Sequence, residues 1–464
     1  MTGSRRVTLS LILAALLGGC ATSGDVARLQ TEAPAPEMRS YEPGRPRPLP
    51  PRRPNADMVQ DFLELGFNME SGREIPRFSR FEGPVQIRTR GDIGPLAQAD
   101  LDRLLGRLRN EARLDITRLR SADPVPEENV ITVEFVPRRQ MRAVVPAAAC
   151  FVVPNVDGWD DFAANRRSPV IDWTRVTQRR KAAVFVPADT TPQEIRDCLH
   201  EEIAQALGPL NDLYRLTDSV FNDDNFQTTL TGFDMLVLRV WNAPELRSGM
   251  RRSEVAARLA PIFNRLNPSG RRSAGRDPGE TPRDWVEAIE QALSSENGLA
   301  QRREGAMRAL DLARAQDWGG SRLALSLMLT ARLAPRDRGD AGLMALLTAA
   351  EIYRGLPGGE VHVAHLDMHL AVQALATGQF EMVLELTDRA RDMAERTENA
   401  AFLASLGFIR AEALEALDQA ERAERLRLDS MAAARYGFGS DAAARARMDE
   451  IARLTGAAIR VASR

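Results

Sequence analysis

The chain has 464 residues, of which 44% are hydrophobic and 27% charged, and its formal net charge is −2 at pH 7. This charge argues against a nucleic-acid-binding protein, because such proteins neutralise phosphates with an excess of lysine and arginine. The length allows two or three globular domains. After the first twenty residues no apolar run is long enough to span a bilayer, so we expect no transmembrane segment.

The first twenty residues have the features of a bacterial export signal. Two arginines precede an apolar stretch, Val7 to Leu17, that is too short to cross a bilayer. The following Leu-Gly-Gly-Cys, ending at Cys20, matches the lipobox of bacterial lipoproteins, which implies removal of residues 1–19 and acylation of Cys20. Several acyl chains would give a durable membrane anchor. We predict a lipid-anchored envelope protein that faces the periplasm, and Ala21 favours the outer membrane; an ordinary signal peptide with a chance cysteine is the alternative.

Residues 20–56 are rich in proline and arginine, which predicts an extended tether. Such a composition cannot bury enough apolar surface to fold. At about 3.1 Å per residue the segment would reach roughly 100 Å. Its arginines could contact anionic lipid headgroups or cell-wall polymer, or they could simply be solvated.

Residues 57–267 alternate between helix-like and strand-like segments, which predicts an α+β domain. Apolar residues at helical spacing predict helices at 57–69, 97–119 and 253–266. Alternating or β-branched apolar runs predict strands at 85–89, 129–136, 147–153 and 182–186. Another helix is predicted from Thr191 to Gly208. Thr191 followed by Glu194 resembles a capping box, Pro192 suits a first helical position, and Gly208 suits a helix end.

Apart from Cys20, the chain has two cysteines, Cys150 and Cys198. An even pair in an exported protein predicts a disulfide. It would join a predicted strand to the helix that contains Cys198 and stabilise the domain by roughly 2–4 kcal/mol. Two buried free thiols are the alternative.

The predicted helix at 191–208 carries the most informative motif of the chain. Counted from Glu201, the spacing is E-E-x-x-Q-x-x-G-x-x-N, the frame of the metzincin zinc-protease helix H-E-x-x-H-x-x-G-x-x-H with all three histidines replaced. This resemblance implies a zincin-like fold in which Glu202 holds the place of the catalytic base. Glu201, Gln205 and Asn211, or Asp212 in place of Asn211, would hold the places of the metal ligands.

The replaced ligands change the chemistry that the motif could support. Zinc prefers imidazole nitrogen and thiolate sulfur, whereas carboxylate and amide oxygens suit a hard cation such as Ca²⁺. Glu202 alone could instead act as an acid on cell-wall glycan. In the simplest interpretation, Glu202 and Gln205 only satisfy buried polar groups. We therefore expect no zinc, and either no cofactor or a hard cation.

The segment from about residue 60 to 265 also resembles a family of proteobacterial lipoproteins of unknown function with the signature EExxQxLGxxND. Further resemblance comes from Ser219-Val220-Phe221 and Asp234. In the metzincin frame Phe221 stands where a methionine is expected, and Asp234 opens the last helix of the fold. The family has no assigned reaction, so the resemblance implies a fold rather than an activity.

A linker is predicted at 268–283, and residues 284–457 are predicted to form an all-helical domain. The predicted helices lie at 284–294, 298–315, 320–333, 340–354, 361–377, 380–395, 399–417 and 419–436, with breaks at glycines and prolines. Paired helices with short turns predict a solenoid of helical hairpins. The segment 374–380 resembles a tetratricopeptide hairpin turn.

His362, His365 and His369 are three of the four histidines and lie within about 80° on one face of a predicted helix. They could form a metal face or line a surface or groove of the helical repeat.

Because the zinc ligands are replaced and the second half looks like helical repeats, the sequence predicts a binding or scaffold protein rather than an enzyme. Its partners would be an envelope protein, bound by the helical repeats, and the membrane, through Cys20. The alternative is an unusual metal-dependent, peptidase-like hydrolase that acts on peptide or cell-wall substrates.

Overall fold

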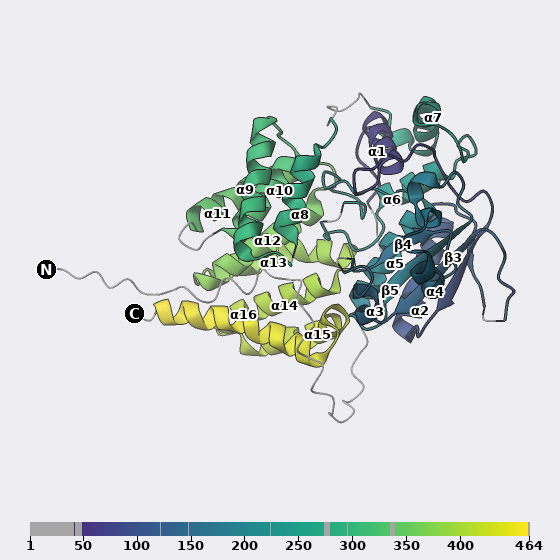
Figure 1. Ribbon diagram of the computed structural model, residues 1–464. Helices are drawn as coiled ribbons and strands as arrows, with labels where there is room; N and C mark the ends of the chain where they lie inside the picture. Colours follow the sequence, from purple (N-terminus) through teal and green to yellow (C-terminus); the bar gives the residue numbers. More distant parts are fainter. Residues whose placement is uncertain are drawn as a thin grey trace. The chain divides into compact units, whose positions relative to one another are not determined.

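The computed structural model describes residues 41, 49–120, 122–146, 148–222, 224–272, 279–294, 296–334 and 339–462. Residues 1–19, Cys20 and the tether as far as residue 48, apart from Tyr41, lie outside the described residues. The chain divides into two compact units, Pro46–Glu280 and a unit that contains Thr281–Arg464 (Figure 1). Within the described ranges, no helix combines the length and apolar character needed to cross a membrane.

The first unit is built on a mixed sheet of five strands in the order β2-β1-β3-β5-β4. Neighbouring strands are parallel except β4, which lies antiparallel to β5 at one edge. The strands are β1 (Val85–Arg90), β2 (Ile116–Arg118), β3 (Val130–Val136), β4 (Phe151–Pro154) and β5 (Lys181–Pro187). The prediction of strands near 85, 129 and 182 is confirmed, whereas β4 is shorter than the predicted strand at 147–153.

One predicted element of this unit is wrong in its second half. The helix predicted at 97–119 ends at Asn110, and Ile116–Arg118 forms β2 instead. Arg113 adopts a positive φ of 59°, which turns the chain. The β-branched Ile116 and Thr117 then pair with Val85 and Gln86 of β1, and this pairing outweighs the helical spacing of the leucines before it.

Helices cover the sheet on both faces, as parallel sheets require. They are α1 (Asn55–Phe67), α2 (Pro95–Asn110), α3 (Arg138–Arg142), α4 (Trp159–Asn165), α5 (Pro192–Leu207), α6 (Gly232–Trp241) and α7 (Arg252–Leu266). Alternate residues of β5 enter two different cores. Ala182, Val184 and Val186 join the larger core with α1, α2, α5 and α6. Ala183 and Phe185 join a smaller aromatic core with α4.

The second unit is helical throughout its described residues. Its helices are α8 (Arg283–Leu293), α9 (Leu299–Ala315), α10 (Ser321–Leu333), α11 (Gly339–Arg354), α12 (Glu360–Ala376), α13 (Phe380–Arg396), α14 (Ala400–Ala416), α15 (Ala420–Phe438) and α16 (Asp441–Ala462). Consecutive helices from α8 to α16 pack on one another. The eight predicted helices are confirmed to within a few residues, and the predicted helical repeats are present.

The helices α12 to α15 begin every 20 residues, at Glu360, Phe380, Ala400 and Ala420. Each of the three turns between them has the same hydrogen bond. The N–H groups of Gln379, Asn399 and Gln419 donate to the carbonyl five residues earlier, at 2.9, 3.1 and 2.9 Å. The residue before each donor has a positive φ. One hairpin therefore takes 40 residues, a regularity that was not found in the sequence.

Candidate functional site

The motif helix α5 follows β5 directly and packs on α2, β4 and β5. It begins as predicted, because Thr191 Oγ1 accepts a hydrogen bond of 3.1 Å from the N–H of Glu194. The carboxylate of Glu194 is engaged by Arg138 and by the Thr190 hydroxyl. The helix ends at Leu207, with Gly208 as its C-cap. The predicted boundaries of the motif helix are therefore confirmed.

The predicted disulfide is present and joins Cys150 to Cys198, with their Cα atoms 5.9 Å apart. Cys150 lies immediately before β4, and Cys198 is a buried residue in the first half of α5. The bond therefore fixes the motif helix covalently to the edge of the sheet.

A buried arginine that was not singled out in the sequence holds the other end of α5. Arg179 donates through Nη1 to the carbonyls of Gln205 and Ala206, at 2.6 and 2.7 Å, and through Nη2 to that of Gly208, at 2.5 Å. Its guanidinium lies 4.9 Å from the ring centroid of Trp173. Burial lowers the pKa of Arg179 to about 9. The arginine thus satisfies carbonyls that a helix end leaves without partners and fixes where the motif ends.

The positions predicted for metal ligands are directed to different partners. Glu201 lines a small cavity beside α5. Gln205 Nε2 donates to Asp212 Oδ2 at 3.4 Å, so the structure brings these two side chains together. Asn211 Nδ2 donates to the carbonyl of Glu64 on α1, at 3.1 Å. Among the residues that the structure describes, no group of three histidines, cysteines or carboxylates is placed to hold a metal ion.

The two remaining polar residues of the motif, Glu202 and His200, are buried, at 5% exposure each. The Nδ1 of His200 accepts a hydrogen bond of 3.0 Å from the N–H of Leu230. Burial, with the nearby cations Arg107 and Arg196, holds the pKa of His200 well below its usual value of 6.5. His200 is therefore a neutral acceptor that joins α5 to the segment before α6, which is a structural role.

A small cavity with mainly polar lining residues lies beside Glu201. Its volume is about 30 Å³, enough for a water molecule or a single ion. Asp197 and Glu201 line it from successive turns of α5. The other lining residues come from one loop and are Ser219, Val220, Asn222, Asp224, Asn225, Gln227 and Thr228. Burial raises the pKa of Asp197 to about 6, although Arg196 opposes this rise.

The loop that closes this cavity is fastened by Asp234 on α6. Ser219 Oγ donates to Asp234 Oδ1 at 2.6 Å, and the N–H groups of Val220 and Thr231 donate to Oδ2 at 3.2 and 2.7 Å. Thr231 and Asp234 form a reciprocal capping box at the start of α6. Burial raises the pKa of Asp234 to about 6. The sequence had singled out Ser219 and Asp234, and the structure brings them into direct contact.

A buried charge cluster on α1 was missed in the sequence. Arg215 contacts Asp61 and pairs with Glu64 at 2.9 Å, and Arg53 contacts Asp61 and pairs with Asp218 at 2.8 Å. The guanidinium of Arg53 also lies 4.3 Å from the ring centroid of Phe233. The signal that could have found the cluster is the pair of acidic residues Asp61 and Glu64, at i and i+3 among the apolar residues of the second half of α1. At this point the arginine-rich segment packs into the folded unit.

Residues 55–261 match the family described as a protein of unknown function, DUF2927. The match extends from α1 into α7 and includes the motif helix, the cavity and the charge cluster apart from Arg53. A search of curated proteins and a search of solved structures each found no significant match. The prediction of a domain of unknown function in this part of the chain is confirmed, and the family description names no activity.

Proposed function

We propose that the protein is an envelope lipoprotein that acts as a binding scaffold. In this proposal a zincin-like domain has lost its metal chemistry, and the helical repeats bind a protein partner. The observation that carries the proposal is the array of hairpins from α8 to α15, in which each helix packs on the next. Arrays of this kind build extended surfaces from nearest-neighbour contacts, and such surfaces commonly bind peptides or helices.

The order of elements supports the zincin-like interpretation of the first unit. A helix, a strand, a helix and further strands precede the motif helix, and a later helix begins near Asp234, as the resemblance implies. The side chains at the ligand positions are a carboxylate and two amides, and they include none of the imidazoles or thiolates on which zinc sites are built. Gln205 contacts Asp212, and Asn211 contacts α1, so the positions serve the packing of the domain.

The resemblance of the second unit to tetratricopeptide repeats lies in the turn rather than in the length. Gly378 takes a φ of 77° and the Gln379 N–H closes the turn. A tetratricopeptide hairpin takes 34 residues, whereas hairpins of HEAT and armadillo type take about 40 to 47. The spacing of 40 residues in α12 to α15 therefore fits a longer hairpin repeat with a tetratricopeptide-like turn.

Cross-linking of the mature full-length chain in solubilised envelopes, read by mass spectrometry, tests the scaffold proposal. We expect cross-links to a partner protein to fall within residues 284–457. The proposal is contradicted if the cross-links fall only within residues 57–267 or if no partner is cross-linked at all. A Cys20→Ala variant tests the anchor, since it should move from the membrane fraction to the soluble fraction.

A second candidate is a metal-dependent hydrolase, and the cavity beside Glu201 is the observation that favours it. Its lining offers carboxylate, amide and hydroxyl oxygens, which are the ligands of hard cations. Calcium titration of the mature chain, followed by thermal melting, tests this candidate. Stabilisation by Ca²⁺ that is lost in Glu201→Gln but kept in the exposed control Glu304→Gln would support it. Peptide hydrolysis abolished by Glu202→Gln, with melting unchanged, would establish it.

A further inference from the structure

The last helix, α16, does not simply extend the array of hairpins. The next helix of a regular array would pack on α14 and α15. In this structure α16 contacts α14 and α15 and also α12, which belongs to the preceding hairpin. α16 therefore lies across the first helices of two successive hairpins, and we call the α12–α14 face that it covers the inner groove.

The face that α16 turns to the inner groove is apolar. Ala444, Ile451 and Leu454 are buried, and Met448 is partly buried against the same core. That core includes Ala371 and Leu375 of α12 and Phe408 and Ile409 of α14. The opposite face of α16 exposes Arg445, Asp449 and Arg453. The helix thus has the spacing of an amphipathic ligand helix bound in a groove.

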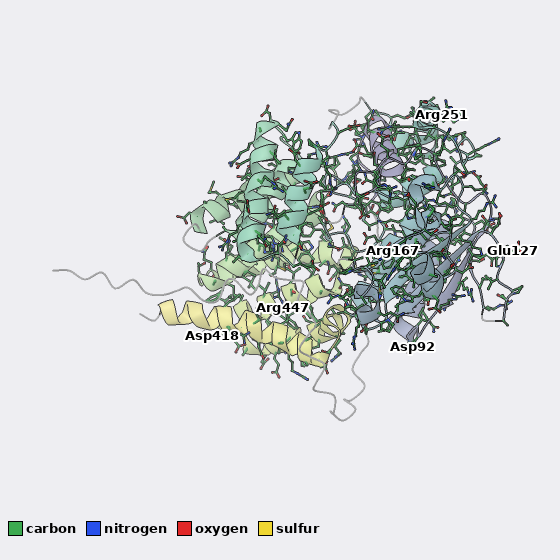
Figure 2. All side chains as sticks on the ribbon, in the orientation of Figure 1. Asp92, Glu127, Arg167, Arg251, Asp418 and Arg447 are labelled. Atoms are coloured by element: carbon green, nitrogen blue, oxygen red, sulfur yellow. A yellow bond between two sulfur atoms is a disulfide. The ribbon has the colours of Figure 1, made fainter. Side chains whose placement is uncertain are left out.

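The contact with α16 leaves polar atoms without partners. Among the described residues, Thr455 Oγ1 and Arg447 Nε are buried and accept or donate no hydrogen bond. Arg447, labelled in Figure 2, pairs at 2.8 Å with Glu450 of its own helix. An unsatisfied buried polar group typically costs about 1–3 kcal/mol. By contrast, Arg389 of α13 donates to both carboxylate oxygens of Asp367 on α12. The α16 contact therefore includes two unsatisfied polar atoms, whereas the Arg389–Asp367 pair between α12 and α13 is fully engaged.

A short turn, Gly439 and Ser440, separates α16 from α15. Gly439 ends α15 with a φ of 89°, a left-handed conformation that favours glycine. Ser440 Oγ then accepts a hydrogen bond of 3.1 Å from the N–H of Ala443 and caps the new helix. Because α16 starts with its own cap, it can leave the inner groove as a helix without unwinding α15.

We propose that α16 is a resident occupant of a helix-binding groove and is displaced by an amphipathic helix of a partner protein. The proposal rests on the proposed scaffold function and adds its regulation. The partner helix would carry small or aliphatic residues at the spacing of Ala444, Ile451 and Leu454 and polar residues on its other face. The free chain is then closed to partners until a competing helix replaces α16.

A labelled peptide of residues 441–462 and the full mature chain test the proposal by fluorescence anisotropy. Ala444→Glu places a charge in the buried contact, and Ala446→Glu makes the same change at an exposed position of the same helix. We expect the peptide to bind Ala444→Glu at least about tenfold more tightly than it binds the wild type or Ala446→Glu. The proposal is overturned if the peptide binds all three chains with equal affinity. It is also overturned if the peptide does not bind an Ala444→Glu chain whose helicity equals that of Ala446→Glu.

A second variant keeps the test decisive if Ala444→Glu loses helicity. Ile451→Ala removes aliphatic contacts without adding a charge. The peptide should bind this variant more tightly than it binds the wild type, but by a smaller factor than for Ala444→Glu. Unchanged affinity in a folded Ile451→Ala chain overturns the proposal. A wild-type dimer that the peptide dissociates would identify a second copy of the chain as the occupant, which overturns the proposed partner.

The experiment with solubilised envelopes separates this inference from the scaffold function. Suppose that the peptide binds Ala444→Glu selectively but that no partner is cross-linked to the wild type or to Ala444→Glu. Then α16 occupies the inner groove, and the scaffold proposal fails. If a partner is cross-linked equally to both chains and the peptide binds neither, the scaffold proposal stands and the inference about α16 is overturned.

Discussion

The helices α5 and α12 carry the four histidines of the chain, but the two helices are held in different ways. α5 ends where Arg179, a residue 26 to 29 positions earlier in the chain, reaches its last carbonyls. α12 ends at a local turn, in which Gly378 has a φ of 77° and Gln379 closes the hydrogen bond. One helix end is therefore determined by tertiary contacts and the other by its own sequence.

The histidines of the two helices differ in the same way. His200 on α5 is fixed by a hydrogen bond from a distant backbone N–H. On α12, His362 stacks on Tyr353, with ring centroids 4.4 Å apart, and His365 stacks on Phe402 at 3.9 Å. Burial holds the pKa of His200 on α5 and of His365 on α12 well below 6.5, so both of these imidazoles are neutral. A row of histidines on a helix can therefore be part of the packing of that helix.

The largest effect is expected for Arg179→Met. The substitution leaves the carbonyls at the end of α5 buried without donors, which should lower the free energy of unfolding by about 3 kcal/mol or more. Arg180→Met is the matched control, because Arg180 is exposed and pairs with Glu128 at the surface, a contact worth at most about 1 kcal/mol. Urea unfolding followed by tryptophan fluorescence measures both variants. Equal effects would mean that the end of α5 does not depend on Arg179.

Loss of the Cys150–Cys198 disulfide should have the next largest effect. A double serine variant is expected to lose roughly 2–4 kcal/mol of unfolding free energy, because the unfolded chain regains the freedom of the closed loop. Thiol labelling of the unreduced, unfolded mature protein checks the bond itself. Two reactive thiols at residues 150 and 198 would show that the bond does not form.

The helical unit should lose stability in acid. Burial, with Arg332 and Arg447 nearby, lowers the pKa of His369 to about 3, whereas an unfolded histidine has a pKa near 6.5. Because the unfolded chain binds the proton first, the stability contributed by neutral His369 is complete above pH 6.5 and is lost as the pH falls toward 3. At pH 5.5 the loss is on the order of 1–2 kcal/mol.

His369→Gln tests this origin of the acid sensitivity, because glutamine does not titrate. Thermal melting at pH 7.5 and pH 5.5 should show a smaller decrease for the variant than for the wild type. The remaining decrease belongs to other groups, including His365, whose pKa is also held well below 6.5 by burial. An identical decrease in the two chains would exclude His369 as a contributor.

The smallest effect concerns the end of α12. Gly378→Ala forces a side chain into a left-handed conformation and should cost about 1 kcal/mol. Gly319→Ala is the control, since its φ is not in that region and an added Cβ has no atom within 4 Å at either glycine. Thermal melting of the helical unit compares the two variants. A Gly378→Ala chain as stable as the Gly319→Ala chain would show that the turn tolerates other conformations.

The helical unit could be predicted closely from the sequence, because its signals are local. Gly378 and the spacing of apolar residues predicted the end of α12 and the start of α13, which the structure confirms. The strand β2 could not be predicted, since Ile116 and Thr117 become extended only when β1 offers partners. In the candidate site, the limits of α5 and the disulfide were predictable, whereas the contacts of Arg179, Asn211 and His200 join residues far apart in the chain.

The metal content of the natively purified mature protein, measured beside Gln205→Ala, tests the central claim most directly. We expect well under one zinc ion per chain in both proteins, because oxygen side chains replace the imidazoles at the ligand positions. One zinc ion per wild-type chain that is lost in Gln205→Ala would instead establish a metal site on α5.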